Sequence, residues 1–171
     1  MSPNLEKNKA LKRYTTVKTG GTAEFFASPE SVPELRELLQ WASSGDHPVT
    51  MLGGGSNVLI ADSGIKGLVI DSRKLKRIHI RGTLLTARAG DALEKAASSA
   101  AEHGLSGLEV FSGLPGTVGG AVYGNAGCFG HEMSDFLAWV DYLDLWGNLH
   151  RLFRSQHKFS YRESPFKHNP W

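Results

Sequence analysis

The chain has 171 residues, enough for one large domain or two small ones with a real hydrophobic core. It has 19 Lys and Arg residues and 17 Asp and Glu residues. The resulting formal net charge of +2 argues against nucleic acid as the main partner. A single cysteine, Cys128, excludes an internal disulfide, and no apolar run reaches the roughly 18 residues of a membrane span, so we expect a cytoplasmic protein that works away from membranes.

The first predicted unit covers residues 1–72 and has the order strand, helix, strand, glycine loop, strand. Short apolar or β-branched runs bounded by turn formers predict its strands at residues 23–27, 49–52 and 67–70. Between the first two, SVPELRELLQWASSG predicts a helix that begins with a capping box of Ser31 and Glu34. Its core-facing residues repeat at helical spacing: Leu35, Leu38, Leu39 and Ala42.

The glycine loop of this unit, LGGGSN from Leu52 to Asn57, places three glycines in a row after a strand. Glycine loses much backbone entropy on folding, so three together indicate a sharp bend or the close approach of another group. The N–H groups of such a loop can converge on a pyrophosphate, although a tight connection with nothing bound would use the same residues. The loop lacks the Gly-Lys-Ser/Thr of a Walker loop, and Val58 stands where a dinucleotide-binding motif needs its last glycine.

The second predicted unit covers residues 73–171 and begins with RKLKR, which we interpret as a solvated connector. We expect the two units to pack together without a flexible linker and to share a crevice. Hairpin turns are predicted at Arg81–Gly82 and at Gly147–Asn148. The strands of this unit are predicted at residues 77–80, 84–89 and 138–145.

A helix in this unit is predicted from DALEKAASSAAEHG. Asp91 is expected to cap it together with Glu94, and Gly104 to end it in the left-handed conformation. The predicted apolar stripe consists of Leu93, Ala96, Ala97, Ala100 and Ala101.

A second glycine-rich segment, SGLPGTVGGAVYGNAGCFG from Ser112 to Gly130, holds seven glycines in 19 residues. A flexible linker would lack its apolar residues, which we expect to be buried anchors: Leu114, Val118, Val122, Tyr123 and Phe129. Such a backbone can lie flat against a large planar or phosphorylated ligand. Two glycine-rich segments, one in each unit, therefore predict one extended ligand held in the crevice.

With both segments in view, the chain resembles the UDP-N-acetylenolpyruvoylglucosamine reductase family, flavoenzymes that complete UDP-N-acetylmuramic acid for peptidoglycan. The resemblance rests on four motifs in order: TTVKTGG, LGGGSNVL, SGLPGTVGGAVYGNAG and YRESPFK. It implies an α+β fold, the two-subdomain FAD-binding module of the vanillyl-alcohol-oxidase (PCMH) type. It also implies FAD as cofactor, NADPH as hydride donor and a UDP-sugar enolpyruvyl ether as the small-molecule substrate.

The resemblance also implies roles for particular residues. Around the FAD pyrophosphate and its neighbourhood it places Gly53, Gly54, Gly55, Ser56, Asn57, Val58 and Leu59. On the flavin side it places Pro115, Gly116, Gly119, Gly120, Asn125 and Gly127. Arg162 matches the active-site arginine, whose guanidinium would stabilise charge developing on the substrate carboxylate. Tyr161 can orient Arg162, contact substrate or simply pack, and Ser56 and Asn57 can alternatively act as turn residues.

The sequence departs from the family after YRESPFK, because family members continue into a C-terminal substrate domain. That domain carries the serine or cysteine that protonates the intermediate and an assisting glutamate. We therefore expect the 171 residues to be a truncated form, a proteolytic fragment or the ordered part of a longer polypeptide, with little or no reductase activity alone. We expect a monomer, no metal site among the seven histidines, and a packing role for Cys128.

Two rival hypotheses remain. One keeps the flavin fold and assigns another oxidoreductase of the same superfamily with a different substrate. The other is a non-catalytic nucleotide-binding or interaction module. Bound flavin absorbs visible light and would exclude the module, whereas NADPH oxidation that depends on the UDP-enolpyruvyl sugar would separate the two enzymes.

Overall fold

The computed structural model describes residues 3–168, and its first part is a four-stranded sheet with one helix. The elements of this part are β1 (Glu6–Ala10), β2 (Thr22–Ala27), α1 (Val32–Ser44), β3 (Val49–Leu52) and β4 (Ile65–Asp71). The strand order is β1-β2-β4-β3, with β1 antiparallel to β2 and the other pairs parallel. The sequence analysis missed β1 because EKNKA has no apolar alternation. Charged residues suit an edge strand, since they discourage pairing with other chains.

The sheet is buried on both faces, and β4 at its centre shows how. Leu68 and Ile70 point to one face and pack with Leu38, Leu39 and Ala42 of α1. Val69 points to the other face and packs with a second cluster that includes Leu11, Phe26, Leu52 and Ile60. Alternate residues of a strand point to opposite faces, so a strand buried on both sides is apolar almost throughout.

Helix α1 begins at the predicted residue and buries the predicted face. Ser31 is the N-cap, and its Oγ accepts a hydrogen bond from the Glu34 N–H at 3.3 Å. The Glu34 carboxylate returns to the N–H of Glu30, at 3.0 Å, rather than to that of Ser31. Leu38, Leu39 and Ala42 are buried, as the periodicity predicts.

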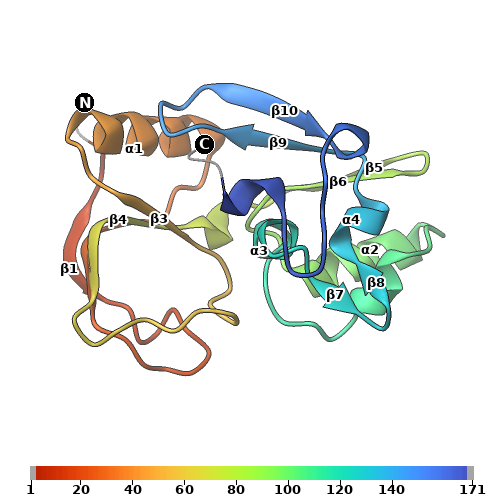
Figure 1. Ribbon diagram of the computed structural model, residues 1–171, viewed down its shortest axis with the longest axis horizontal. Coiled ribbons are helices and arrows are strands. Elements are labelled where there is room, and N and C mark those ends of the chain that lie inside the picture. The colour runs from red at the N-terminus through yellow and green to blue at the C-terminus, as the bar shows by residue number, and fades with distance from the viewer. Residues whose placement is uncertain (1–2, 169–171) are drawn as a thin grey trace.

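The second part of the chain is built from helices and two-stranded hairpins (Figure 1). Its elements are η1 (Ser72–Lys74), β5 (Ile78–Arg81), β6 (Leu84–Ala87), α2 (Leu93–Glu102), η2 (Leu108–Phe111), α3 (Val118–Tyr123), β7 (Gly127–Cys128), β8 (His131–Glu132), α4 (Met133–Phe136), β9 (Trp139–Leu143), β10 (Leu149–Phe153), η3 (Arg154–Gln156) and η4 (Pro165–Lys167). Residues of α2, η2, α3 and α4 pack around Phe111, which is fully buried. Cys128 is half-buried and packs against this cluster.

Helix α2 forms where it was predicted, but its cap was assigned wrongly. The N-cap is Ala92, which makes no side-chain capping bond. The Asp91 carboxylate instead accepts hydrogen bonds from the N–H groups of Arg77 and Arg88, at 3.0 and 2.8 Å. Asp91 therefore joins the ends of the β5–β6 hairpin to α2. Ala101 is exposed rather than part of the stripe, whereas Gly104 ends the helix with φ +70° as predicted.

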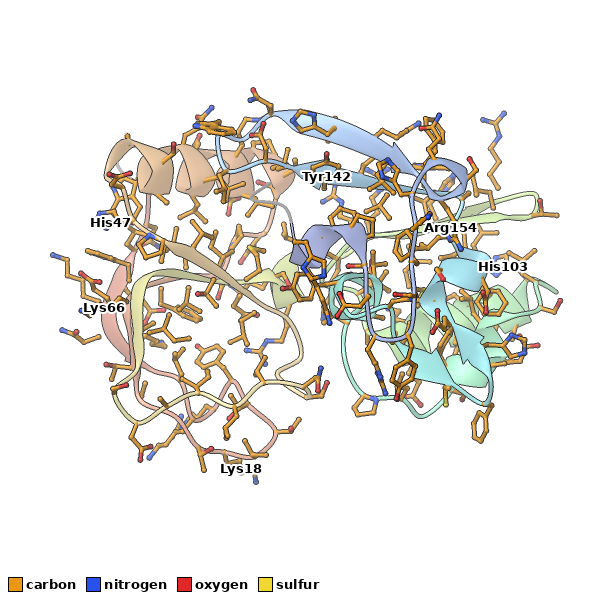
Figure 2. All side chains as sticks on the ribbon, viewed as in Figure 1. Lys18, His47, Lys66, His103, Tyr142 and Arg154 are labelled. Carbon is orange, nitrogen blue, oxygen red and sulfur yellow. The ribbon has the colours of Figure 1, made fainter. Side chains whose placement is uncertain are left out.

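The β9–β10 hairpin joins the two parts of the molecule, lying across α1 at one end and above α4 at the other (Figure 1). Val140 packs in the Phe111 cluster, and Leu143 packs against the α1 cluster. At the hairpin loop, the Arg36 Nε of α1 donates to the Gly147 carbonyl at 2.8 Å. At the other end lies Arg154, which Figure 2 labels. Its Nε donates to the Ser134 carbonyl at 3.1 Å.

Asp144 organises the hairpin loop, and its pKa predicts that the stability of the fold depends on pH. Partial desolvation opposes ionisation, but hydrogen bonds from His150, Asn148 and Trp146 lower the pKa of Asp144 far below its usual range. A lowered pKa stabilises the fold above the unfolded-state value of about 3.9, and this contribution is lost as pH falls through the folded-state pKa. Asp144→Asn should therefore unfold at lower urea concentration than wild type at pH 7, with the gap narrowing below about pH 4. A gap independent of pH would contradict this assignment.

Within the described residues, no helix has the length and apolar character needed to cross a membrane. Across residues 3–168, no three His, Cys, Asp or Glu side chains gather in an arrangement that could hold a metal ion.

Candidate functional site

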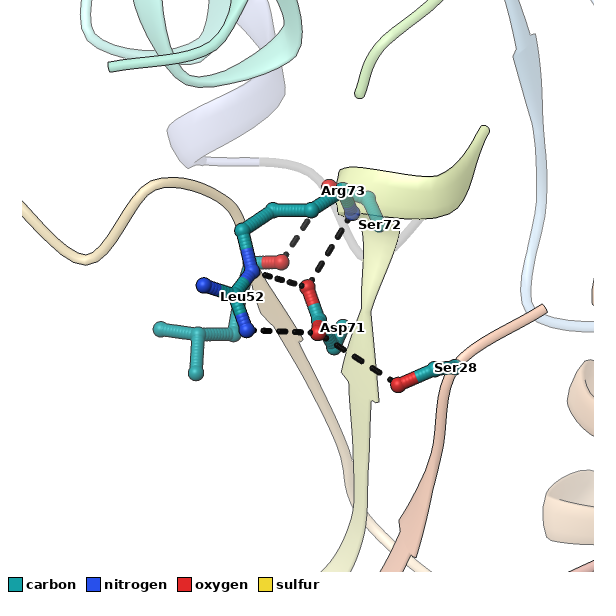
Figure 3. A network of polar contacts seen from close by, with 5 residues as sticks. All are labelled: Ser28, Leu52, Asp71, Ser72 and Arg73. Carbon is teal, nitrogen blue, oxygen red and sulfur yellow. Dashed lines mark hydrogen bonds and ion pairs between the residues drawn. The ribbon is translucent and has the colours of Figure 1, made fainter. Parts of the chain in front are cut away.

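The site begins where β2, β3 and β4 end, and a polar network fixes these three ends (Figure 3). Asp71, at the end of β4, accepts two hydrogen bonds of 2.9 Å from the Arg73 guanidinium and one of 3.4 Å from the hydroxyl of Ser28. The Ser72 hydroxyl donates to the Leu52 carbonyl at 3.1 Å. The bonds from Arg73 to Asp71 raise the pKa of the Arg73 guanidinium. The network thus holds the residue that precedes the glycine loop.

This network revises the interpretation of RKLKR as a solvated connector. Arg73 is clamped by Asp71 and lies over the Tyr14 ring, with 4.9 Å between its guanidinium carbon and the ring centroid. Lys74 forms an ion pair of 2.6 Å with Glu30. The first two basic residues therefore tie η1 to the first part of the chain.

The glycine loop rests on the segment that follows β1. Both the N–H and the hydroxyl of Thr16 donate to the Gly55 carbonyl, at 3.1 and 3.3 Å. Gly55 has φ +69°, and a Cβ there would lie 1.9 Å from the Tyr14 carbonyl oxygen. Gly55 is buried, so only glycine fits this turn. Thr16 of the TTVKTGG motif thus holds the glycine loop in place through two hydrogen bonds.

The two glycine-rich segments come into direct contact, whereas the sequence predicted one extended ligand held between them in a crevice. A Cβ on Gly53 would lie 2.5 Å from the Thr117 Oγ1, and one on Gly54 would lie 3.0 Å from the Cα of Gly116. The Ser56 hydroxyl donates to the Pro115 carbonyl at 3.1 Å. The opposite segment therefore leaves no room for side chains at Gly53 and Gly54. From the sequence, the absence of these side chains was attributed to the close approach of a phosphate.

Four consecutive backbone N–H groups of the glycine loop have no acceptor among the described residues. Within residues 3–168, the backbone N–H groups of Gly54, Gly55, Ser56 and Asn57 donate to no protein acceptor. Residues 56–59 are exposed, and the Leu59 side chain is 84% accessible. Consecutive free N–H groups beside an exposed loop are the donor set that suits a phosphate or pyrophosphate.

Helix α3 continues the site from the point where the segments meet. Thr117 caps it, with its Oγ1 accepting from the Gly120 N–H at 3.3 Å. Gly119 faces the protein, since a Cβ there would lie 2.8 Å from that of Ala89. Gly120 and Tyr123 are exposed and lie three residues apart, so one face of α3 is open and presents backbone and an aromatic ring.

Two of the expected buried anchors are on the surface. Tyr123 is 53% exposed and Phe129 is 86% exposed, whereas Val122 is buried and Leu114 and Val118 pack against the Phe111 cluster. Apolar identity alone does not distinguish a core residue from one that contacts a ligand. Tyr123 therefore joins the candidate site as a residue that the sequence analysis misassigned.

Arg162 lies on a tight turn beside α3. Ser160 and Glu163 exchange two backbone hydrogen bonds, of 3.2 and 2.8 Å, which close the turn around Tyr161 and Arg162. Arg162 has φ +58° and is exposed. Its guanidinium carbon lies 5.9 Å from the Tyr161 ring centroid, and that ring is 77% accessible. Tyr161 therefore does not pack in the core.

The expected cofactor contact of Asn125 is revised. Its side chain has no exposed surface and bonds to Glu132, Ser134 and Ser160. The amide of Asn125 is thus fully occupied within the protein. Gly127 lies nearby in the β7–β8 hairpin, where it pairs with Glu132.

Comparison with known proteins identifies the fold that carries this site. Residues 23–152 match the protein family described as FAD binding domain. The chain belongs to this family. The predicted fold class, an α+β FAD-binding module, is confirmed. The 6-hydroxy-D-nicotine oxidase of Arthrobacter nicotinovorans shares the fold, with a TM-score of 0.62 at 18% identity over 88% of this chain and 33% of its own.

The FAD-binding domain also has relatives at higher identity. It is 40% identical over 97% of its length to a UDP-N-acetylenolpyruvoylglucosamine reductase from Latilactobacillus sakei, and it covers 55% of that protein. The crystal structure of the Thermus caldophilus reductase matches with a TM-score of 0.77 and 34% identity, covering 94% of this chain and 56% of that one. The resemblance to these reductases is thus confirmed for part of their length. The chain spans about half of the relatives it matches.

Proposed function

We propose that the chain is the FAD-binding part of a UDP-N-acetylmuramate dehydrogenase, which uses NADPH to reduce UDP-N-acetylglucosamine enolpyruvate for peptidoglycan synthesis. Its support is the contact between the two glycine segments, which leaves the N–H groups of Gly54 to Asn57 without protein acceptors. These donors fit the pyrophosphate of FAD, and the relatives that match over nearly the whole of this chain are reductases by name. A cytoplasmic location is part of this proposal.

The residues present divide the binding of FAD between two segments. Gly53 to Asn57, with the exposed Val58 and Leu59, would hold the pyrophosphate. Pro115, Gly116 and the open face of α3 at Gly120 would line the flavin, because the two glycines carry no side chain. Gly119 and Gly127 would contribute to the site indirectly. Gly119 lets α3 pack against Ala89, and Gly127 pairs with Glu132 in the β7–β8 hairpin. When bound, FAD supplies hydride transfer between NADPH and the substrate double bond.

Arg162 would act on the substrate. Addition of hydride to the enolpyruvyl double bond moves negative charge onto the substrate carboxylate. A guanidinium that faces this carboxylate lowers the energy of the charged transition state, and its rigid fork can donate at two points. Tyr161, beside it and exposed, is placed to contact the same substrate. The proton that completes the reduction is expected from a domain outside residues 1–171.

FAD titration tests the cofactor assignment on the chain as it stands. We expect one FAD to bind per chain, with a shifted visible absorption spectrum and altered flavin fluorescence. Failure to bind FAD at micromolar concentrations, by a chain that shows cooperative unfolding, would contradict the proposal and favour the non-catalytic module.

Activity is tested in a chimera that joins residues 1–171 to the C-terminal half of the Latilactobacillus sakei reductase. The chimera should oxidise NADPH only when the UDP-enolpyruvyl sugar is present, whereas residues 1–171 alone should show little turnover. A chimera that binds FAD but oxidises NADPH without regard to this sugar would favour another oxidoreductase of the same fold.

A further inference from the structure

The turn that carries Arg162 has a backbone conformation that needs support. A non-glycine residue with positive φ has a strained backbone and persists only where its surroundings hold it. Arg162 has φ +58° on an exposed turn, and the two hydrogen bonds between Ser160 and Glu163 are internal to that turn. Internal bonds fix the shape of the turn but not its position on the protein. Its position must come from contacts with other elements.

The Lys167 Nζ of η4 donates to the Arg162 carbonyl, and two further hydrogen bonds tie the turn to the end of α3, one on each side of the turn. The Asn125 Nδ2 donates to the Ser160 carbonyl at 2.9 Å, and the Ser164 hydroxyl donates to the Tyr123 carbonyl at 2.6 Å. Both partners lie at the C-terminal end of α3, the helix whose other end meets the glycine loop. A six-residue helix is about 9 Å long, so the turn is held at a fixed short distance from that meeting point.

Asn125 is the stronger of the two anchors because its own orientation is fixed. Its Oδ1 accepts from the Ser134 N–H at 3.0 Å, and its Nδ2 also donates to the Glu132 carboxylate at 2.7 Å. This site requires one acceptor and two donors on a single planar group, which only an amide of this length provides. The side chain is completely buried, so water cannot replace any of the three partners.

We propose that Asn125 is a positioning residue for Arg162: through the Ser160 carbonyl, it holds the turn that carries Arg162 against the C-terminal end of α3. Asn125 itself contacts neither cofactor nor substrate. The proposal rests on the proposed function for the part Arg162 plays in binding the substrate carboxylate. The positioning of the turn is a property of the chain alone and can be measured without any ligand.

The first test is amide hydrogen exchange on residues 1–171. In Asn125→Ala, exchange at the Glu163 amide, which bonds to the same Ser160 carbonyl, should be at least about tenfold faster than in wild type. Asn148→Ala is the matched control, since it removes a side-chain amide that donates to Asp144 in the β9–β10 loop and leaves the turn untouched. Unchanged exchange at Glu163 in a folded Asn125→Ala protein would overturn the proposal.

The second test is a double-mutant cycle in the chimera. Asn125→Ala should lower kcat by about 10–100-fold with FAD affinity within threefold of wild type, because the guanidinium is displaced rather than lost. In an Arg162→Ala background, the same change should have no further effect on kcat. An equal loss in both backgrounds would show that Asn125 acts through general stability and would overturn the proposal.

A second substitution at Asn125 and one at Ser164 test the same proposal independently. If Asn125→Ala does not fold, Asn125→Ser keeps a small polar side chain without placing a second carboxyl group beside Glu132, so the same exchange and cycle apply. Ser164→Ala breaks the second anchor and should change Glu163 exchange and kcat in the same direction by a smaller factor. If the wild-type chimera is inactive, the proposed function fails, while the exchange result still decides whether Asn125 positions the turn.

Discussion

Arg162→Ala in the chimera is expected to lower kcat by about 10²–10³-fold while leaving FAD binding unchanged. This is the loss seen when a single donor to developing negative charge is removed from an active site. Arg162 is exposed and its side chain forms no ion pair within residues 3–168, so the substitution should not disturb the fold. Its loss should therefore affect the chemical step and not stability.

Two comparisons sharpen this result. Arg162→Lys keeps the charge but replaces the planar fork by a point charge, so part of the activity should return. Arg81→Ala removes an exposed arginine from the β5–β6 hairpin and should leave kcat within twofold of wild type. Steady-state rates of NADPH oxidation measure all three. Equal activities of the Arg162→Ala and Arg81→Ala chimeras would remove Arg162 from the reaction.

Gly55→Ala should destabilise the chain by about 2–5 kcal/mol and abolish FAD binding. The added Cβ would lie 1.9 Å from the Tyr14 carbonyl oxygen, so the backbone of the loop or of residues 14–16 must move. That movement would break the bonds from Thr16 to the Gly55 carbonyl and turn the free N–H groups away from one another. Urea unfolding and FAD titration give the two effects separately.

Gly104→Ala provides the matched control, because Gly104 has φ +70° and nothing lies within 4 Å of its Cβ position. This variant isolates the cost of the left-handed conformation, about 1–2 kcal/mol, from the cost of the overlap. It should bind FAD like wild type. If Gly55→Ala were no less stable than Gly104→Ala, the loop would have to be more deformable than its contacts with Tyr14 and Thr16 indicate.

Local patterns predicted the elements whose causes are local. Helix α1 begins where it was predicted to begin because Ser31 and Glu34 act within its first turn. Asp91 was misassigned because its partners, the N–H groups of Arg77 and Arg88, are brought to it by the β5–β6 hairpin, which its local sequence does not reveal. Strand β1 escaped detection because its stability comes from pairing with β2 rather than from its own apolar residues.

The segments that form the site were predicted from the sequence, but the contacts that explain their residues were not. The sequence analysis placed the two glycine segments together, but the absence of side chains at Gly53 and Gly54 is explained by Thr117 and Gly116 of the opposite segment. It gave Asn125 a ligand to bind, although the partners of its amide are protein groups 7 to 35 residues away along the chain. Contacts of this kind become visible only in three dimensions. The boundary between the two predicted units near residue 72 stays a prediction.

The hairpin that crosses α1 has a consequence for how the chain is made. The Arg36 guanidinium and the Gly147 carbonyl that it contacts are 111 residues apart in sequence. At the usual speed of translation, roughly 5–20 s elapse between the emergence of the first and that of the second from the ribosome. Over that interval the contact between α1 and the hairpin cannot form, so the hairpin docks on α1 late in the folding of the newborn chain.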